Sequence, residues 1–344
     1  MAWSVVSRGS TSCSRDAIFS TAVMPCDEGH TSMDVLDAND YLERLLAAPR
    51  PGATNILAFL DYRVGAICKE PKFLLIPLDD HLCHRGDGVF ETLSYRSRRV
   101  LLLDAHLERL RNSADALHLV PPCPWNELRA LVLDVARASG VEQGALRILL
   151  GRGPGGFGIS PRECPVPSLY IIAMPSPDLP ETVYEKGYSS CRSSIPARQS
   201  YIARIKNTNY LPNVLMTEEA RRRGFDIPLS FDDKGNLAES AIANVGLVDV
   251  QGALVVPEFT HALPGTTVLK ALELAGAYMA VSTRPVPEEE IYSAREFLLF
   301  STAPGCVPIT SYEGRPINDG QPGPVAKRLR QDLREALLRE GTPL

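Results

Sequence analysis

The sequence has no apolar run long enough to cross a membrane; stretches such as SLYIIAM and EFLLF are of strand length. Its eight cysteines form no CxxC pair and show no regular spacing, which is typical of reduced thiols in a cytosol-like compartment. A strong charge of one sign is also missing, because the net charge is −5 and most arginines have acidic neighbours along helical stretches. We therefore expect neither a membrane nor a nucleic-acid partner, and a cytoplasmic location.

Three patterns that would indicate other kinds of site are incomplete. HLCH places His81 and His84 three residues apart around Cys83, but no second ligand pair accompanies them, so no metal is predicted. GRGPGGFG fits neither the P-loop nor the GxGxxG spacing, and it precedes a strand. Ser240 lacks the GxSxG elbow of a serine hydrolase. We interpret the glycine-rich stretch as a loop whose backbone other groups can approach closely.

Lysine is scarce, with seven residues among 36 basic ones. Six lie in polar or helical-surface contexts, whereas Lys206 follows an apolar, strand-like pattern in YIARIKNTNYLPNV. Lysine is rarely buried without a partner or a function, because burial disfavours the ammonium form and so favours a Schiff-base nucleophile. The alternative is that Lys206 extends its ammonium to water from a strand edge.

The chain length and its 44% apolar content predict two domains. Residues 1–32 are Ser/Thr-rich; a disordered leader, a transit peptide and translation upstream of a start at Met33 are all compatible, and the acidic residues favour the leader. We then expect a helical extension (33–54), a small domain (55–175), a proline-spaced linker (174–181) and a large domain (182–344). Mixed strands and helices without regular βαβ alternation indicate an α+β fold with mainly antiparallel sheets.

Several segments have clear patterns of secondary structure. We predict strands at NILAFLDYRVGAI, FLLIP and IARIK, a hairpin around RSRR, and a helix at 104–119 with Asp104 as its N-cap. A second helix ends at Gly140. Beyond the linker we expect the helix NVLMTEEARRRG, two strand pairs with turns at DDKGN and DVQGA, a helix entered from LPGTT, and a terminal amphipathic helix.

Three further features could bind an anion or a cation. Gly265, Thr266 and Thr267 stand where a helix begins, so free N–H groups there suit a phosphate. Ser301 and Thr302 form a second small-residue turn, and Arg109 lies on a helix. Glu239 lies among apolar and small residues. Taken singly, each also fits an ordinary cap, turn or surface pair.

Together these segments resemble the class IV (fold type IV) aminotransferases, which use pyridoxal phosphate. The resemblance covers residues 55–330 and rests on HRGDGVFETLSY with LDAHLERLRNSADAL, RIKNTNYLPNVLM with GNLAESAIANV, LPGTTVLKAL, and STAPGCVPI. It implies a smaller N-terminal α/β domain, a larger C-terminal domain with a barrel-like sheet, and the cofactor between them. It also implies a homodimer whose active sites include loops of the neighbouring subunit.

The resemblance further implies roles for particular residues. Lys206 would form the internal aldimine and move the proton between substrate and cofactor, and Glu239 would pair with the pyridine nitrogen. Tyr210 would contact the cofactor ring's oxygen. The phosphate would be held by Arg109, Thr266, Thr267, Ser301 and Thr302.

The motifs indicate the cofactor more directly than the reaction, because the choice of reaction depends on the groups of the substrate and not on the core motifs. The loop GRGPGGFGIS resembles that of the aminodeoxychorismate lyases, yet it carries Phe157 and Ile159 where lyases and D-amino-acid enzymes tend to carry a carboxylate-binding Arg or His. Arg147 and Arg152 are the cations available for a carboxylate, and Phe90 and Phe157 would line the substrate pocket. We expect an amino-acid aminotransferase that passes an amino group to a 2-oxo acid, with 4-amino-4-deoxychorismate lyase as the alternative.

Overall fold

The computed structural model describes residues 33–344, so the predicted leader lies outside the described part. Its contacts separate the residues up to Pro51 from Gly52–Leu344. In the first unit, helix α1 (Ala38–Ala47) begins after Asp37, whose carboxylate accepts hydrogen bonds from the N–H groups of Asn39 and Asp40. The predicted short helix is therefore confirmed. Among the described residues, no helix is both long and apolar enough to cross a membrane.

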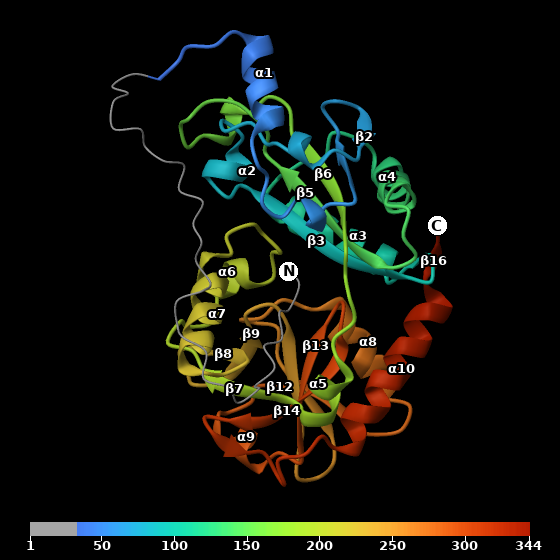
Figure 1. The fold of residues 1–344 in the computed structure, drawn as a ribbon. Coiled ribbons are helices and arrows are strands. Elements are labelled where there is room, and N and C mark those ends of the chain that lie inside the picture. Colours follow the sequence, from blue (N-terminus) through green and yellow to red (C-terminus); the bar gives the residue numbers. More distant parts are fainter. Residues whose placement is uncertain (1–32) are drawn as a thin grey trace, which may run out of the picture. The chain divides into compact units, whose positions relative to one another are not determined.

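The second unit contains an antiparallel sheet of seven strands (Figure 1). Helices α3 (Leu103–Ala116) and α4 (Trp125–Ala138) cover one face, where Leu110 and Leu128 meet Leu93 and Ile148 in a continuous apolar core. In sheet order the strands are β16 (Thr342–Pro343), β4 (Arg99–Val100), β3 (Gly88–Arg96), β5 (Gly144–Gly151), β6 (Ser168–Met174), β1 (Ala58–Asp61) and β2 (Ala66–Cys68).

A second, mixed sheet of nine strands follows the segment 175–180 (Figure 1). Along its central strand β13, Phe297 and Leu299 enter one apolar cluster, while Leu298 and Phe300 enter another that includes helices α8 (Thr266–Ala275) and α10 (Pro324–Glu340). The sheet order is β12 (Val281–Arg284), β11 (Leu254–Pro257), β10 (Asn244–Val248), β13 (Glu296–Ser301), β14 (Gly305–Tyr312), β7 (Tyr188–Arg192), β8 (Ile227–Phe231) and β9 (Leu237–Ser240), with β15 (Arg315–Pro316) beside β14.

Further helices and turns complete the described chain. They are α2 (His81–His84), α5 (Glu181–Lys186), α6 (Ser200–Ala203), α7 (Leu211–Arg223) and α9 (Glu289–Ser293), with 3₁₀ turns at Ala53–Asn55, Pro71–Phe73 and Pro161–Glu163. The predicted α+β class and most predicted elements are confirmed, including the hairpin around RSRR and both strand pairs of the second sheet.

Three local predictions are wrong. FLLIP forms no strand, because Pro71–Phe73 is a 3₁₀ turn and Leu75 and Ile76 remain exposed. IARIK belongs instead to helix α6 and the turn after it. Helix α3 begins one residue before Asp104, after Leu102 in the left-handed conformation, and Asp104 pairs with Arg129. In each case the tertiary contacts decide the local structure against the sequence pattern.

Candidate active site

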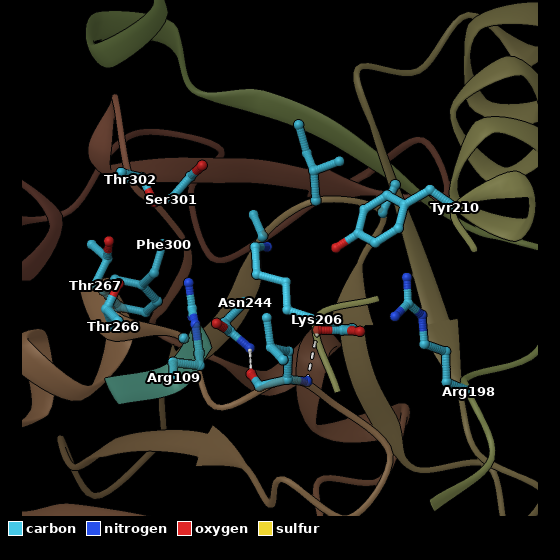
Figure 2. Close-up of a pocket in the computed structure, with 16 residues that line it drawn as sticks. Arg109, Arg198, Lys206, Tyr210, Asn244, Thr266, Thr267, Phe300, Ser301 and Thr302 are labelled. Atoms are coloured by element: carbon cyan, nitrogen blue, oxygen red, sulfur yellow. Dashed lines mark hydrogen bonds between the residues drawn. The ribbon is translucent and has the colours of Figure 1, made fainter. Parts of the chain in front are cut away.

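One pocket in residues 52–344 gathers side chains from helix α3, which covers the first sheet, and from the second sheet and its connections. Figure 2 shows Lys206 near its centre, with Arg109 and the hydroxyl residues on one side and Tyr210 and Arg198 on the other. All the residues that the sequence predicts to hold the cofactor line this pocket: Arg109, Lys206, Tyr210, Glu239, Thr266, Thr267, Ser301 and Thr302.

Lys206 is held in place by its backbone. Its N–H donates to Ser113 Oγ at 3.1 Å, and its carbonyl accepts from the N–H of Phe90 at 2.9 Å. The side chain enters the pocket past two aromatic rings, with Nζ 4.7 Å from the ring centre of Phe90 and 5.9 Å from that of Tyr210. Because the backbone is fixed on both sides, the amine has a defined position rather than a free surface one.

The anion-binding end of the pocket is the N-terminus of helix α8. Gly265 precedes the helix, and a Cβ there would lie 1.9 Å from Asn244 Oδ1, so only glycine fits without displacing Asn244. Thr266 and Thr267 form the first turn, where backbone N–H groups have no partner within the helix. Ser301 and Thr302, at the end of β13, face the same space. This arrangement suits a phosphate.

A buried network that the sequence interpretation missed supports Arg109. Glu91, fully buried on β3, accepts from Arg109 Nε at 2.7 Å and from Arg109 Nη2 at 2.9 Å, and the carbonyl of Pro264 accepts from Nη1 at 3.2 Å. Glu91 Oε2 also lies 2.7 Å from His106 Nδ1. The only sequence signal was that Glu91 interrupts an apolar strand, which does not reveal its partners.

The protonation states of this network follow from its geometry. Burial acts to raise the pKa of Glu91, but His106 and Arg109 outweigh it and hold the pKa far below its usual range. Burial lowers the pKa of His106, so the imidazole is neutral. The ionised Glu91 can only accept, so His106 donates from Nδ1, and its Nε2 then accepts from the Thr266 hydroxyl at 3.2 Å. Thr266 can therefore offer an anion only its backbone N–H.

Glu239, on β9, also lines the pocket. Its Oε2 accepts from the N–H of Leu263 at 3.1 Å. Burial raises the pKa of Glu239 to about 7, against the opposing effects of that hydrogen bond and of Arg198, Lys206 and Arg109. A carboxylate in this state gains from a positively charged group placed beside it.

The predicted substrate residues divide into two groups. Phe90 is buried and places its ring 4.9 Å from that of Tyr210, and Arg147 Cζ lies 5.2 Å from the Phe90 ring centre. Arg147 Nε is buried without a hydrogen-bond partner among the described residues, and burial lowers the pKa of its guanidinium. Within the described chain, Arg147 is therefore a partly buried cation whose buried Nε is an unused donor.

None of these four residues lines the pocket itself. Phe90 contacts the lining residues Lys206 and Tyr210, and Arg147 contacts Phe90, whereas Arg152 and Phe157 have their contacts elsewhere. Both Asp87 carboxylate oxygens accept from Arg152, at 2.9 and 3.0 Å, and so do the carbonyls of Leu117 and His118. Arg152 thus ties a loop to β3 rather than facing the space beside Lys206. Phe157 is 66% exposed in this chain.

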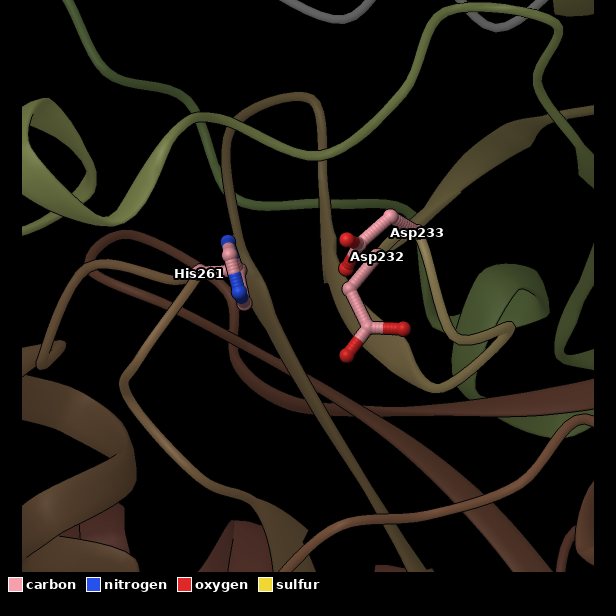
Figure 3. Close-up of side chains that lie close together, drawn as sticks. All are labelled: Asp232, Asp233 and His261. Carbon is pink, nitrogen blue, oxygen red and sulfur yellow. The ribbon is translucent and has the colours of Figure 1, made fainter.

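One group of possible metal ligands lies outside the pocket (Figure 3). Asp232, Asp233 and His261 bring one ligand atom each within 4.8 Å of one another. Asp232 already accepts from the N–H groups of Lys234 and Asn236 and from the Asn236 side chain, as expected of a turn residue. His261 Nδ1 donates to the Arg198 carbonyl at 2.9 Å. These bonds account for the positions of Asp232 and His261.

Comparison with known proteins agrees with this geometry. The family model for amino-transferase class IV matches residues 88–312. The chain belongs to the class IV aminotransferases. The chloroplastic D-amino-acid transaminase of Arabidopsis thaliana is 32% identical to this class IV chain, over 94% of this chain and 87% of its own length. A putative branched-chain-amino-acid aminotransferase of Methanocaldococcus jannaschii is 30% identical over 79% of this chain and 94% of its own.

Solved structures confirm the predicted fold type IV. The Escherichia coli branched-chain amino acid aminotransferase matches with a TM-score of 0.76 and 26% identity, over 83% of this chain and 94% of that one. A T.th. branched-chain amino acid aminotransferase with pyridoxamine 5′-phosphate matches with a TM-score of 0.77 and 26% identity, over 81% and 93%. This class IV chain is therefore a pyridoxal-phosphate-dependent amino-acid aminotransferase, as predicted.

Proposed function

We propose that the pocket around Lys206 holds pyridoxal phosphate and transfers an amino group from an amino acid to a 2-oxo acid. The observation that carries the proposal is the meeting, in one pocket, of an amine, a carboxylate and a helix N-terminus backed by Arg109. These are the three groups that bind the cofactor's aldehyde, ring nitrogen and phosphate. The donor set therefore fits the cofactor.

Each residue has a separate task. When bound, pyridoxal phosphate supplies an electron sink for the substrate's α-carbon. Lys206 Nζ would take the proton from that carbon and move it to the cofactor, because it is the amine that the pocket holds. Glu239 would pair with the ring nitrogen. Arg109, the N–H groups of Thr266 and Thr267, and the hydroxyls of Thr267, Ser301 and Thr302 hold the phosphate.

Arg147 is our candidate for binding a substrate carboxylate. Arg147 and Lys206 contact the same Phe90 ring, at 5.2 and 4.7 Å from its centre, so a molecule bound by both rests against Phe90. The buried Nε, unpartnered within the described chain, gives Arg147 a donor that a carboxylate satisfies. Arg152, whose partners are internal, is assigned to structure.

Two measurements test the reaction. Purified wild-type protein should show a visible cofactor band that borohydride removes and that Lys206→Ala lacks, and the exposed Lys186→Ala variant should retain it. Protein without such a band contradicts the proposal.

In single turnover, an amino acid should convert the bound cofactor to its pyridoxamine form. A panel of L- and D-amino acids then identifies the substrate and its enantiomer. Release of pyruvate from aminodeoxychorismate, with no conversion by any amino acid, would establish the lyase alternative.

We further propose a homodimer located in the cytoplasm. Phe157 and Ile159 are 66% and 83% exposed, and a neighbouring subunit would cover them and place Phe157 at its own pocket. Light scattering should give twice the chain mass, and a monomeric active enzyme would exclude the dimer. Residues 1–32 fused to a fluorescent reporter should stay in the cytoplasm; import into an organelle would overturn the location.

A further inference from the structure

Arg198 is the pocket cation to which the sequence interpretation gave no role. It precedes helix α6 and lines the same pocket as Glu239, and Figure 2 shows its guanidinium on the same side of Lys206 as the Tyr210 ring. Three contacts hold it. Its Nη2 donates to Asn213 Oδ1 at 2.7 Å, its Cζ lies 4.6 Å from the Tyr210 ring centre, and its carbonyl accepts from His261 Nδ1 at 2.9 Å. A side chain fixed on this many sides has a defined position in the pocket.

Three cations that share the pocket with Glu239 favour its charged form. Arg109 lies on α3, Lys206 in the segment after α6, and Arg198 in the segment before α6. Arg109 is already balanced by the buried Glu91 carboxylate. Lys206 is the reactive amine in the proposed function and cannot serve as a permanent counter-ion. Arg198 pairs with an amide oxygen instead of a carboxylate, so its charge is the one left for Glu239.

Arg198 also links the two groups that flank the cofactor ring in the proposed function. Its planar guanidinium rests on the ring of Tyr210, which in turn contacts Phe90 at 4.9 Å. Asn213, which holds the guanidinium, also donates to the carbonyl of Ala241, two residues after Glu239. A displacement of Arg198 would therefore change the packing of Tyr210 and, through Asn213, the hydrogen bond to Ala241 just after the strand that carries Glu239.

We propose that Arg198 is a positioning residue that favours the charged form of the Glu239 carboxylate and holds the Tyr210 ring in place before the ligand enters. This inference rests on the proposed role of Glu239 opposite the ring nitrogen. It assigns to Arg198 an electrostatic task for which a lysine would suffice, and a stacking task for which only a planar guanidinium suffices.

The test follows Glu239 directly, in cofactor-free protein labelled with ¹³Cδ-glutamate. The Glu239 signal is the one missing from Glu239→Gln. Burial sets its pKa to about 7 in the wild type, with Arg198 as the largest of the opposing charges. Arg198→Met should raise the titration midpoint by about one pH unit. Arg204→Met, which removes an exposed arginine six residues further on, should leave it unchanged.

Arg198→Lys separates the two tasks. It should keep the Glu239 midpoint within about half of the shift seen in Arg198→Met, yet reduce the near-ultraviolet circular dichroism of Tyr210 as Arg198→Met does. Unchanged midpoints in Arg198→Met overturn the proposal. If that variant fails to fold, Asn213→Ala, which frees the guanidinium but keeps its charge, decides the question. It should change both signals, and no change in either overturns the proposal.

This titration needs no cofactor, so its outcome is independent of the Lys206→Ala absorbance test. A visible band with an unmoved Glu239 midpoint would reject the role of Arg198 alone. A shifted midpoint without a band would reject the proposed function and leave the electrostatics of Arg198 standing.

Discussion

The anion-binding end of the pocket differs from the rest of the site in how fully its polar groups are hydrogen-bonded within the protein. At the anion end, Glu91, His106, Arg109 and Thr266 form a closed network in which each charged or polar side chain has a protein partner. Elsewhere in the pocket, Glu239 has a single backbone donor. Beside the pocket, Arg147 packs on the Phe90 ring, and its Nε has no hydrogen-bond partner within residues 33–344. The polar groups behind the anion-binding end are therefore satisfied within the protein, whereas Glu239 and Arg147 keep hydrogen-bonding capacity that a ligand can use.

The largest effect is expected when Glu239, which has few protein partners, is changed. Glu239→Gln should lower kcat by about 10²- to 10⁴-fold, because the positive charge at the ring nitrogen loses its counter-ion. The free energy of unfolding should change little or rise, since a poorly solvated carboxylate is removed. Steady-state kinetics and urea unfolding measure the two. Glu258→Gln, which changes an exposed carboxylate, is the control. A strong loss of stability in Glu239→Gln would contradict the comparison.

The next largest effect is expected when the hydrogen-bond network that supports Arg109 is broken. Glu91→Gln leaves Arg109 buried without its carboxylate and should lower the free energy of unfolding by about 3 kcal/mol. Glu108→Gln, an exposed residue on the same turn of α3, should change it by less than about 0.5 kcal/mol. Equal effects of the two substitutions would show that the network does not stabilise the fold.

Acid titration sharpens the same prediction. The pKa of Glu91 is lower in the folded protein than its ordinary value of 4.5. Its contribution to stability is therefore complete above that value and is lost as the pH falls toward the folded pKa. The difference in unfolding free energy between wild type and Glu91→Gln should shrink below about pH 4.5. A difference that stays constant down to the acid transition would show that charge is not its origin.

A smaller effect compares two arginines that lie close together in the sequence. Arg147→Met should raise KM for the amino acid by about 10- to 100-fold, the value of a charged hydrogen bond, with little loss of stability. Arg152→Met should do the reverse, lowering the free energy of unfolding by about 1–3 kcal/mol because Asp87 loses its partner. If Arg147→Met instead lowered stability and Arg152→Met raised KM, Arg152 would be the substrate-binding residue and Arg147 the structural one.

The smallest effect concerns one hydroxyl. Thr266→Val leaves His106 Nε2 without a donor and should lower the free energy of unfolding by about 1 kcal/mol. Thr266→Ser keeps the hydroxyl and should cost less. Because Thr266 offers an anion only its backbone N–H, affinity for inorganic phosphate should be similar in both variants; a selective loss in Thr266→Val would indicate direct contact through the hydroxyl.

Much of the site was predictable because its residues lie in short, ordered motifs. Lys206, Glu239 and the GTT turn stand out by chemistry within their own segments, and the fold brings them together in one pocket. The support of Arg109 was not predictable, since Glu91 and His106 meet it only through the packing of α3 on β3. Arg147 and Arg152 look alike in sequence, and only the position of Asp87 separates them.

The fold was predictable where apolar periodicity is strong, as in α3, α4 and β5. It was not predictable at FLLIP, where an apolar run remains partly exposed in this chain, or at IARIK, where a four-residue helix replaces a strand. Short segments carry too few residues for periodicity to outweigh long-range contacts.

Residues 263–267 have a further consequence. Leu263 donates to Glu239 and accepts from Asn244, the Pro264 carbonyl receives Arg109, and Gly265 leads directly into the helix that offers its N–H groups. One five-residue segment thus contacts both Glu239 and the anion-binding end of the pocket. In the proposed function it would fix the distance between the basic nitrogen and the anion of a ligand, so lengthening the segment by one residue should relax discrimination by ligand size.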